Sequence, residues 1–97
     1  MKVRNMESAR GNMVPNQFII EGVDEQDNWC EYFQSYKSVI AKKAHHKDTG
    51  ELQVYLDVNK WDYSVITGKY RNEFLGEKKS RTEKKIASGE YVLVDLN

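Results

Sequence analysis

Apolar and polar residues alternate along much of the middle of the chain, and this period of two predicts β-strands. The clearest case is residues 51–58, ELQVYLDV. Its apolar positions, which would face the core, are Leu52, Val54, Leu56 and Val58. The preceding Asp48-Thr49-Gly50 predicts a tight turn, because a glycine at the third loop position can adopt the left-handed conformation. Residues 37–58 are therefore predicted to form a β-hairpin.

Three further segments have strand character: residues 17–22 (QFIIEG), 29–36 (WCEYFQSY) and 90–96 (EYVLVDL). Residues 1–16 are polar, have no sustained period and end in Pro-Asn. We therefore expect a flexible tail at 1–16, followed by a single domain at 17–97.

The period changes after Trp61 and favours helices. Ser64 or Thr67 can cap a first helix, and Gly76 suits the left-handed position beyond its end. The inner face of this helix would carry Tyr70, Phe74 and Leu75.

Residues 80–83, Ser-Arg-Thr-Glu, match a capping box that would open a second short helix ending at Gly89. The resulting order is β-β-β-β-α-α-β. It predicts an α+β fold, with a mostly antiparallel β-sheet and two short helices packed on one face.

Composition narrows the function classes. The chain has 97 residues, is 39% hydrophobic and lacks both a long apolar run and a signal-peptide pattern. We therefore expect a soluble, cytoplasmic protein that makes no membrane contact. Fifteen basic and fifteen acidic residues give no net charge, which argues against a broadly basic nucleic-acid binder. Basic residues still cluster locally, in residues 37–47 and 69–85.

The segment Thr67-Gly68-Lys69 resembles part of a phosphate-binding loop. The full motif requires a glycine five residues before the Gly-Lys pair and a Ser or Thr after it, where this chain has Tyr63 and Tyr70. The pattern therefore argues against an NTPase. A simple anion contact at this helix start stays open.

No catalytic, metal or cofactor site emerges from the remaining residues. His45 and His46 are adjacent on a predicted strand, so their side chains would point to opposite faces. Cys30 is the only cysteine, which excludes an internal disulfide, and we expect a packed, unreactive thiol. The sequence therefore predicts a protein that is not an enzyme and needs no cofactor.

Aromatic and basic residues are the best candidates for binding a partner. Tyrosines and lysines on strands serve both protein interfaces and single-stranded nucleic-acid surfaces, although packing against the helices could also explain the aromatic residues. The partner-binding candidates are Tyr32, Tyr36, Lys42, Lys43, Tyr55, Lys69 and Arg71.

Three strings, YFQSYKSVIAK, WDYSVITGKYRNEFLGE and KKIASGEYVLVDLN, resemble a family of small uncharacterised proteins encoded by bacteriophages and other bacterial mobile elements. The resemblance covers residues 17–97. It implies no activity, cofactor or site residue, but it does imply an accessory protein acting in the host cytoplasm.

We expect the partner to be a host bacterial protein or nucleoprotein complex, so that the protein could inhibit a host defence or replication factor. The alternative is a nucleic-acid-binding accessory protein that uses the basic and aromatic patches. The protein could be a monomer or a homodimer, because an uncovered edge strand can pair with its copy.

Overall fold

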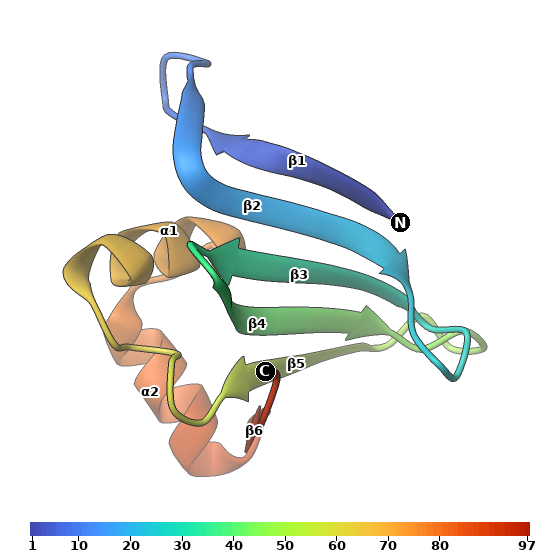
Figure 1. The fold of residues 1–97 in the computed structure, drawn as a ribbon. Helices are drawn as coiled ribbons and strands as arrows, with labels where there is room; N and C mark the ends of the chain where they lie inside the picture. The colour runs from blue at the N-terminus through green and yellow to red at the C-terminus, as the bar shows by residue number, and fades with distance from the viewer.

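The computed structural model describes residues 1–97 as one six-stranded sheet with two helices on one side (Figure 1). The strands are β1 (Lys2–Glu7), β2 (Met13–Val23), β3 (Trp29–Ser35), β4 (Ser38–His45), β5 (Leu52–Asp57) and β6 (Tyr91–Val94). The helices are α1 (Val65–Leu75) and α2 (Lys79–Ser88). Neither helix is long and apolar enough to cross a membrane.

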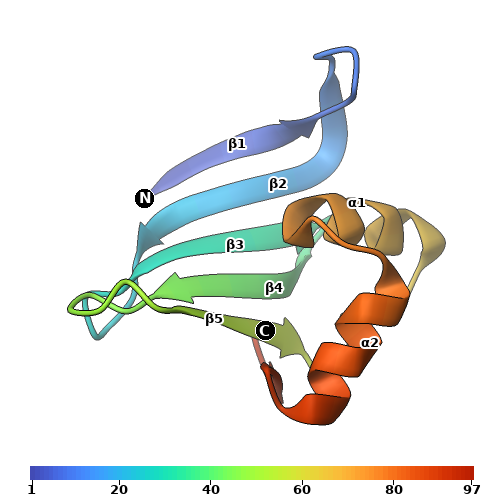
Figure 2. The same cartoon turned by 180° about the vertical axis from the view of Figure 1, so that it is seen from behind.

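The sheet follows chain order from β1 to β6. Strands β1 to β5 form an antiparallel meander, whereas β6 lies parallel to β5 because α1 and α2 carry the chain back across the sheet. Seen from the helix side in Figure 2, both helices lie over one end of the sheet. The opposite face, toward the viewer in Figure 1, has no helix on it. The predicted α+β fold is confirmed.

The N-terminal segment is strand rather than flexible tail, so that prediction is wrong for residues 1–16. Strand β1 pairs with β2 from Lys2↔Glu21 to Glu7↔Met13, and β2 begins four residues before the predicted start at Gln17. The segment was missed because β1 is an edge strand, and Met6 is its only buried residue. Edge strands carry polar side chains on both faces and so lose the alternation that marks strands.

The hairpin of β4 and β5 is confirmed. Gly50 has a φ of 73°, and its N–H donates to the His46 carbonyl at 2.8 Å to close the turn. Of the four apolar positions expected in the core, only Val54 and Leu56 are buried. Leu52 and Val58 are about half exposed, since burial in this sheet depends on helix cover as well as on face.

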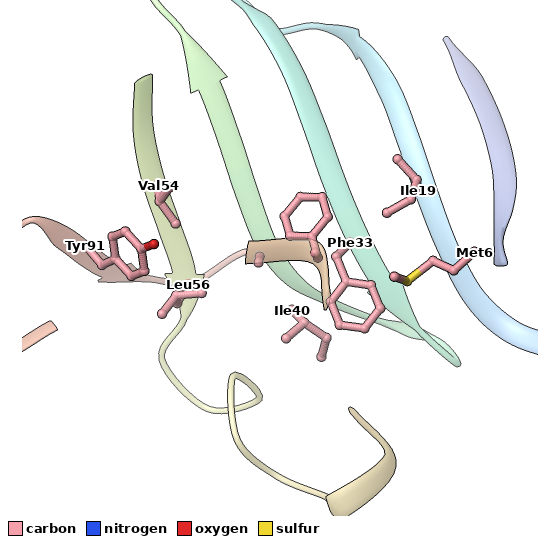
Figure 3. Close-up of a cluster of buried hydrophobic side chains, with 9 residues drawn as sticks. Met6, Ile19, Phe33, Ile40, Val54, Leu56 and Tyr91 are labelled. Carbon is pink, nitrogen blue, oxygen red and sulfur yellow. The ribbon is translucent and has the colours of Figure 1, made fainter. Parts of the chain in front are cut away.

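Each strand contributes to the core on the helix side of the sheet, as Figure 3 shows. The Phe33 and Phe74 rings stack with their centroids 5.9 Å apart, which fastens α1 to β3. Trp61, Tyr70 and Leu75 pack around this cluster. The buried cluster comprises Met6, Ile19, Phe33, Ile40, Ala41, Val54, Leu56, Phe74 and Tyr91.

Helix α1 begins and ends as predicted. The Ser64 hydroxyl accepts from the Thr67 N–H at 3.1 Å, and Gly76 has a φ of 70°. The cap of α2 is different: its N-cap is Lys78, without a side-chain hydrogen bond, so the predicted capping box at 80–83 is wrong. Gly89 does end α2, as expected.

The Thr82 side chain turns inward and donates to Glu77 Oε2 at 2.6 Å. Lys85 Nζ and Tyr91 Oη donate to the other oxygen of the same carboxylate, at 2.7 and 2.9 Å. Burial would raise the pKa of Glu77, but these hydrogen bonds together lower it below its ordinary value. The carboxylate thereby joins α2 to β6, a polar connection that no sequence pattern indicated.

Candidate partner-binding surface

One straight row of side chains crosses the helix-free face of the sheet from edge to edge. The strand register pairs Tyr32 with Lys42, and Lys42 with Tyr55, as neighbours on β3, β4 and β5. The same register continues the row to Ile20 and Val3 on one side and to Val92 on the other. We call this set the open row: Val3, Ile20, Tyr32, Lys42, Tyr55 and Val92. Three of the seven predicted binding residues therefore lie side by side.

Lys42 is the centre of the open row. Its Nζ lies 5.6 Å from the ring centroids of both Tyr32 and Tyr55, in cation–π contact with each, and 3.5 Å from Asp24 Oδ2. Burial alone would lower the pKa of Lys42, but Tyr32, Cys30 and Asp24 together raise it. The amine therefore stays charged at neutral pH, and its charge is balanced within the cluster.

The turn between β2 and β3 supplies the carboxylate. Asp24 Oδ1 accepts from the backbone N–H groups of Asn28 and Gln26, at 3.0 and 2.9 Å. The hydrogen bond from Asn28 is the main reason that the pKa of Asp24 falls to about 2. Beside it, a shallow cleft of about 340 Å³ is lined in part by Lys42. The turn therefore holds a fixed anion beside Lys42, at the centre of the open row.

Cys30 lies under this turn and is fully buried. Its Sγ is 3.6 Å from Asp24 Oδ2 and 3.4 Å from the Asn28 carbonyl oxygen. Burial raises the pKa of the Cys30 thiol. The prediction of a packed thiol is confirmed.

Lys43 faces the other way, although it is adjacent to Lys42. Its Nζ lies 4.3 Å from the Phe74 ring centroid and donates to the Phe74 carbonyl near the end of α1. A cation there satisfies a helix-end carbonyl and interacts favourably with the helix dipole. Lys43 therefore supports the helix layer and does not share a surface with Lys42.

Arg71, expected to face outward, is 1% exposed, so the prediction of an accessible Arg71 is wrong. Its guanidinium donates to the Trp61 carbonyl at 2.7 Å and to Asp62 Oδ1 at 3.0 Å, and lies 5.1 Å from the Trp61 ring centroid. Asp62 also pairs with Lys79 of α2 at 2.6 Å. Arg71 thus ties the loop before α1 to both helices.

The anion contact considered at the start of α1 has little to support it. Thr67 and Gly68 are buried, and their N–H groups donate to the Ser64 side chain and the Ser64 carbonyl. Lys69 is exposed, but it lies on α1, which packs on the other side of the sheet from the open row. Lys69 does not join the open row.

Residues 1–89 match a family of unknown function, DUF8033. The chain belongs to this family. No curated protein and no solved structure matches it. The DUF8033 match includes β1 and the start of β2, which agrees with their place in the sheet and extends beyond the residues 17–97 that carried the sequence resemblance.

The remaining basic residues of this DUF8033 member divide between separate surfaces. Basic side chains of α2 and of its N-cap residue line an open groove of about 1030 Å³, with Glu77 and Glu90 at the same groove. Its basic residues are Lys78, Arg81, Lys84 and Lys85. The basic run at 37–47 is split by strand alternation, so it does not form one continuous patch.

Both histidines have local partners. His45 Nε2 lies 3.7 Å from Glu31 Oε1 on the neighbouring strand, and His46 Nδ1 accepts from the Asp48 N–H at 3.2 Å within the turn. No three His, Cys, Asp or Glu side chains converge in a way that could hold a metal ion.

Tyr36, the last predicted binding residue, lies in the two-residue turn between β3 and β4. It borders a cleft of about 560 Å³ that also includes Phe18, Lys60 and Tyr63. Sequence reasoning did not single out these three residues, which come from β2 and from the loop before α1. The only available signal was their type, aromatic and basic, because their contact depends on the tertiary fold.

Proposed function

We propose that this protein is a non-enzymatic binding protein that docks the open row onto the surface of a partner protein. The observation that carries the proposal is the register that lines up Tyr32, Lys42 and Tyr55 on the face without helices. Tyrosine is enriched at protein interfaces, because its ring gives apolar contact and its hydroxyl can hydrogen-bond.

The size of the row suits such a contact. Strands in a sheet lie roughly 4.8 Å apart, so a row across six strands is about 24 Å long. An ordinary protein interface covers about 800 Å² on each partner, which corresponds to a patch of similar width. Val3 and Val92 are exposed at the two ends and extend the apolar character of the row to both edges.

Charge favours a protein over a nucleic acid at the open row. Lys42 is its only cation, and Asp24 balances that charge at 3.5 Å. Nucleic-acid binding needs several cations that can replace the counterions of the phosphates. The buried, protonated state of the Cys30 thiol and the charged state of Lys42 also favour binding over chemistry.

The biological setting is part of the proposal. The resemblance of the strings around Tyr36, Trp61 and the C-terminus to phage and mobile-element proteins supports an accessory role in the bacterial cytoplasm. The partner would then be a host protein or nucleoprotein complex, such as a defence or replication factor that this protein inhibits.

Site-specific photocrosslinking tests the proposal. A photoreactive amino acid at position 55 should give a discrete adduct with one bacterial protein in a lysate, and a competing unlabelled wild-type chain should suppress it. The matched control is the same group at Lys84, which is exposed on α2. No adduct at position 55, or equal adducts at both positions, would contradict the proposal. An adduct with a second copy of the chain would identify a homodimer interface instead.

A further inference from the structure

The cleft beside Tyr36 lies at the end of the sheet where β3 turns into β4. It has a volume of about 560 Å³, within the usual range of roughly 300–1,000 Å³ for small-ligand sites. Phe18 and Gln34 come from paired positions on β2 and β3, Tyr36 and Lys37 form the turn, and Lys60 and Tyr63 lie in the loop before α1.

Charge in this cleft has one sign. Lys37 and Lys60 are its only charged lining residues. Neither lysine forms an ion pair within the protein, in contrast to Lys42 of the open row. A protein with no net charge therefore has a local site that attracts anions.

The other lining side chains are aromatic rings, amides and the Ser38 hydroxyl. Tyr36 and Tyr63 are 45% and 43% exposed, so much of each ring is accessible to a ligand. Phe18 adds a third ring, and Lys60 Nζ lies 5.1 Å from the Tyr63 ring centroid. The Gln34 amide donates to the Tyr36 carbonyl at 2.8 Å, which leaves its own oxygen as an acceptor. Aromatic rings stack on nucleobases, and amides can bond their edges.

Two residues that line the cleft, Asn16 and Tyr36, have a positive φ, a backbone conformation that is rare for residues other than glycine. Tyr36 has a φ of 56° and Asn16 a φ of 65°, and the Tyr36 N–H donates to the Asn16 carbonyl at 2.7 Å. A positive φ at the first position of a two-residue hairpin turn favours glycine, whereas a bulky side chain there is strained. Such strain is often found at functional sites. The turn keeps a tyrosine where the fold alone would favour glycine.

We propose that this cleft binds a nucleoside phosphate, with the base against the aromatic rings and the phosphate near Lys37 and Lys60. The ligand can be a free nucleotide or one nucleotide unit of a single strand, since both have the same recognised chemistry. This site is separate from the partner docking proposed for the open row and does not depend on it.

Titrations of the full chain with AMP and with a fluorescent single-stranded oligonucleotide test the site. The wild type should bind at least one of the two, and Lys37→Gln with Lys60→Gln should weaken that binding by roughly tenfold. Lys69→Gln with Lys84→Gln is the matched control, because both lysines are exposed and lie outside the cleft. Binding of AMP alone indicates a free nucleotide, whereas much tighter, salt-sensitive binding of the oligonucleotide indicates a single strand.

Tyr36→Gly separates the ligand contact from the fold. Glycine removes the ring but relieves the positive φ, so the melting temperature should stay the same or rise while binding falls by roughly fivefold or more. No binding by the wild type, or the same loss with both lysine pairs, would overturn the proposal. Unchanged binding by Tyr36→Gly would do so as well. The crosslink at position 55 should persist in every cleft variant, so failure of this site and failure of partner docking are distinguishable.

Discussion

Two neighbouring rows of side chains cross this sheet one residue apart and point to opposite faces. One row is the candidate binding surface, and the other lies on the helix side of the sheet. The open row carries Tyr32, Lys42 and Tyr55 on the face without helices. Next to it runs what we call the helix-side row: Glu21, Glu31, Lys43, Val54 and Tyr91, on the opposite face. Lys42 and Lys43 are adjacent in sequence, yet one meets two tyrosines and the other meets a helix end. The comparison shows that a single step along a strand separates a binding candidate from a structural residue.

The largest expected effect is on the helix side of the sheet. Arg71→Met should lower the free energy of unfolding by about 3 kcal/mol, because it removes the hydrogen bonds to Trp61 and Asp62 from a buried site. Urea unfolding followed by circular dichroism measures the change. Lys69→Met, on the exposed side of the same helix, should change the same quantity by no more than about 0.5 kcal/mol. Equal effects of the two substitutions would contradict the buried role of Arg71.

Lys42 and Lys43 provide a direct test of the difference between the open row and the helix-side row. Lys43→Met should cost about 1.5 kcal/mol, because the Phe74 carbonyl loses a charged donor and the ring loses a cation. Lys42→Met should cost less, about 0.5 kcal/mol, since Asp24 keeps its hydrogen bonds from the Gln26 and Asn28 N–H groups when the cation is removed. The readouts are the unfolding free energy for both variants and the crosslink yield at position 55. Only Lys42→Met should reduce the crosslink. A reduced crosslink with Lys43→Met and not with Lys42→Met would contradict the assignment of partner binding to the open row.

Gln17 is a polar defect on the helix side. It is 1% exposed, and neither its Nε2 nor its Oε1 has a hydrogen-bond partner. Gln17→Met removes that unsatisfied group at similar size and should raise the unfolding free energy by about 1 kcal/mol. Gln53→Met is the control, because the Gln53 amide donates to the carbonyls of Val54 and Glu90 and should lose stability on substitution. A loss of stability with Gln17→Met would mean that its amide is satisfied in solution.

The smallest effect concerns acid stability on the open face. The pKa of Asp24 falls from 3.8 to about 2 on folding, so its contribution to stability is complete above pH 3.8 and is lost as the pH falls toward about 2. Asp24→Asn cannot titrate, so the stability difference between the wild type and this variant should shrink over that range. Urea midpoints for both proteins at several pH values measure it. A stability difference that stays constant with pH would show that folding does not lower the pKa of Asp24.

Local sequence signals determined much of this fold. Alternation predicted β5, strand-favouring residues predicted β2, β3 and β6, the turn at Gly50 marked the hairpin of β4 and β5, and Ser64 and Gly76 marked the ends of α1. Each of these signals depends on residues close in the chain. Alternation in residues 51–58 also placed Tyr55 on the face away from the core. The polar edge strand β1 and the cap of α2 lacked such a signal and were missed.

Only the tertiary structure decided which exposed positions belong together. Strand register brought Tyr32, Lys42 and Tyr55 into one row, while the packing of α1 buried Arg71 and gave Lys43 a helix end to bind. The cleft at Tyr36 joins β2, a turn and a distant loop. Periodicity assigns a residue to a face, but contact between segments far apart in the chain depends on how the sheet and helices pack. For this reason the sequence alone determined most of the elements and the faces of their strands, and the fold determined the surfaces.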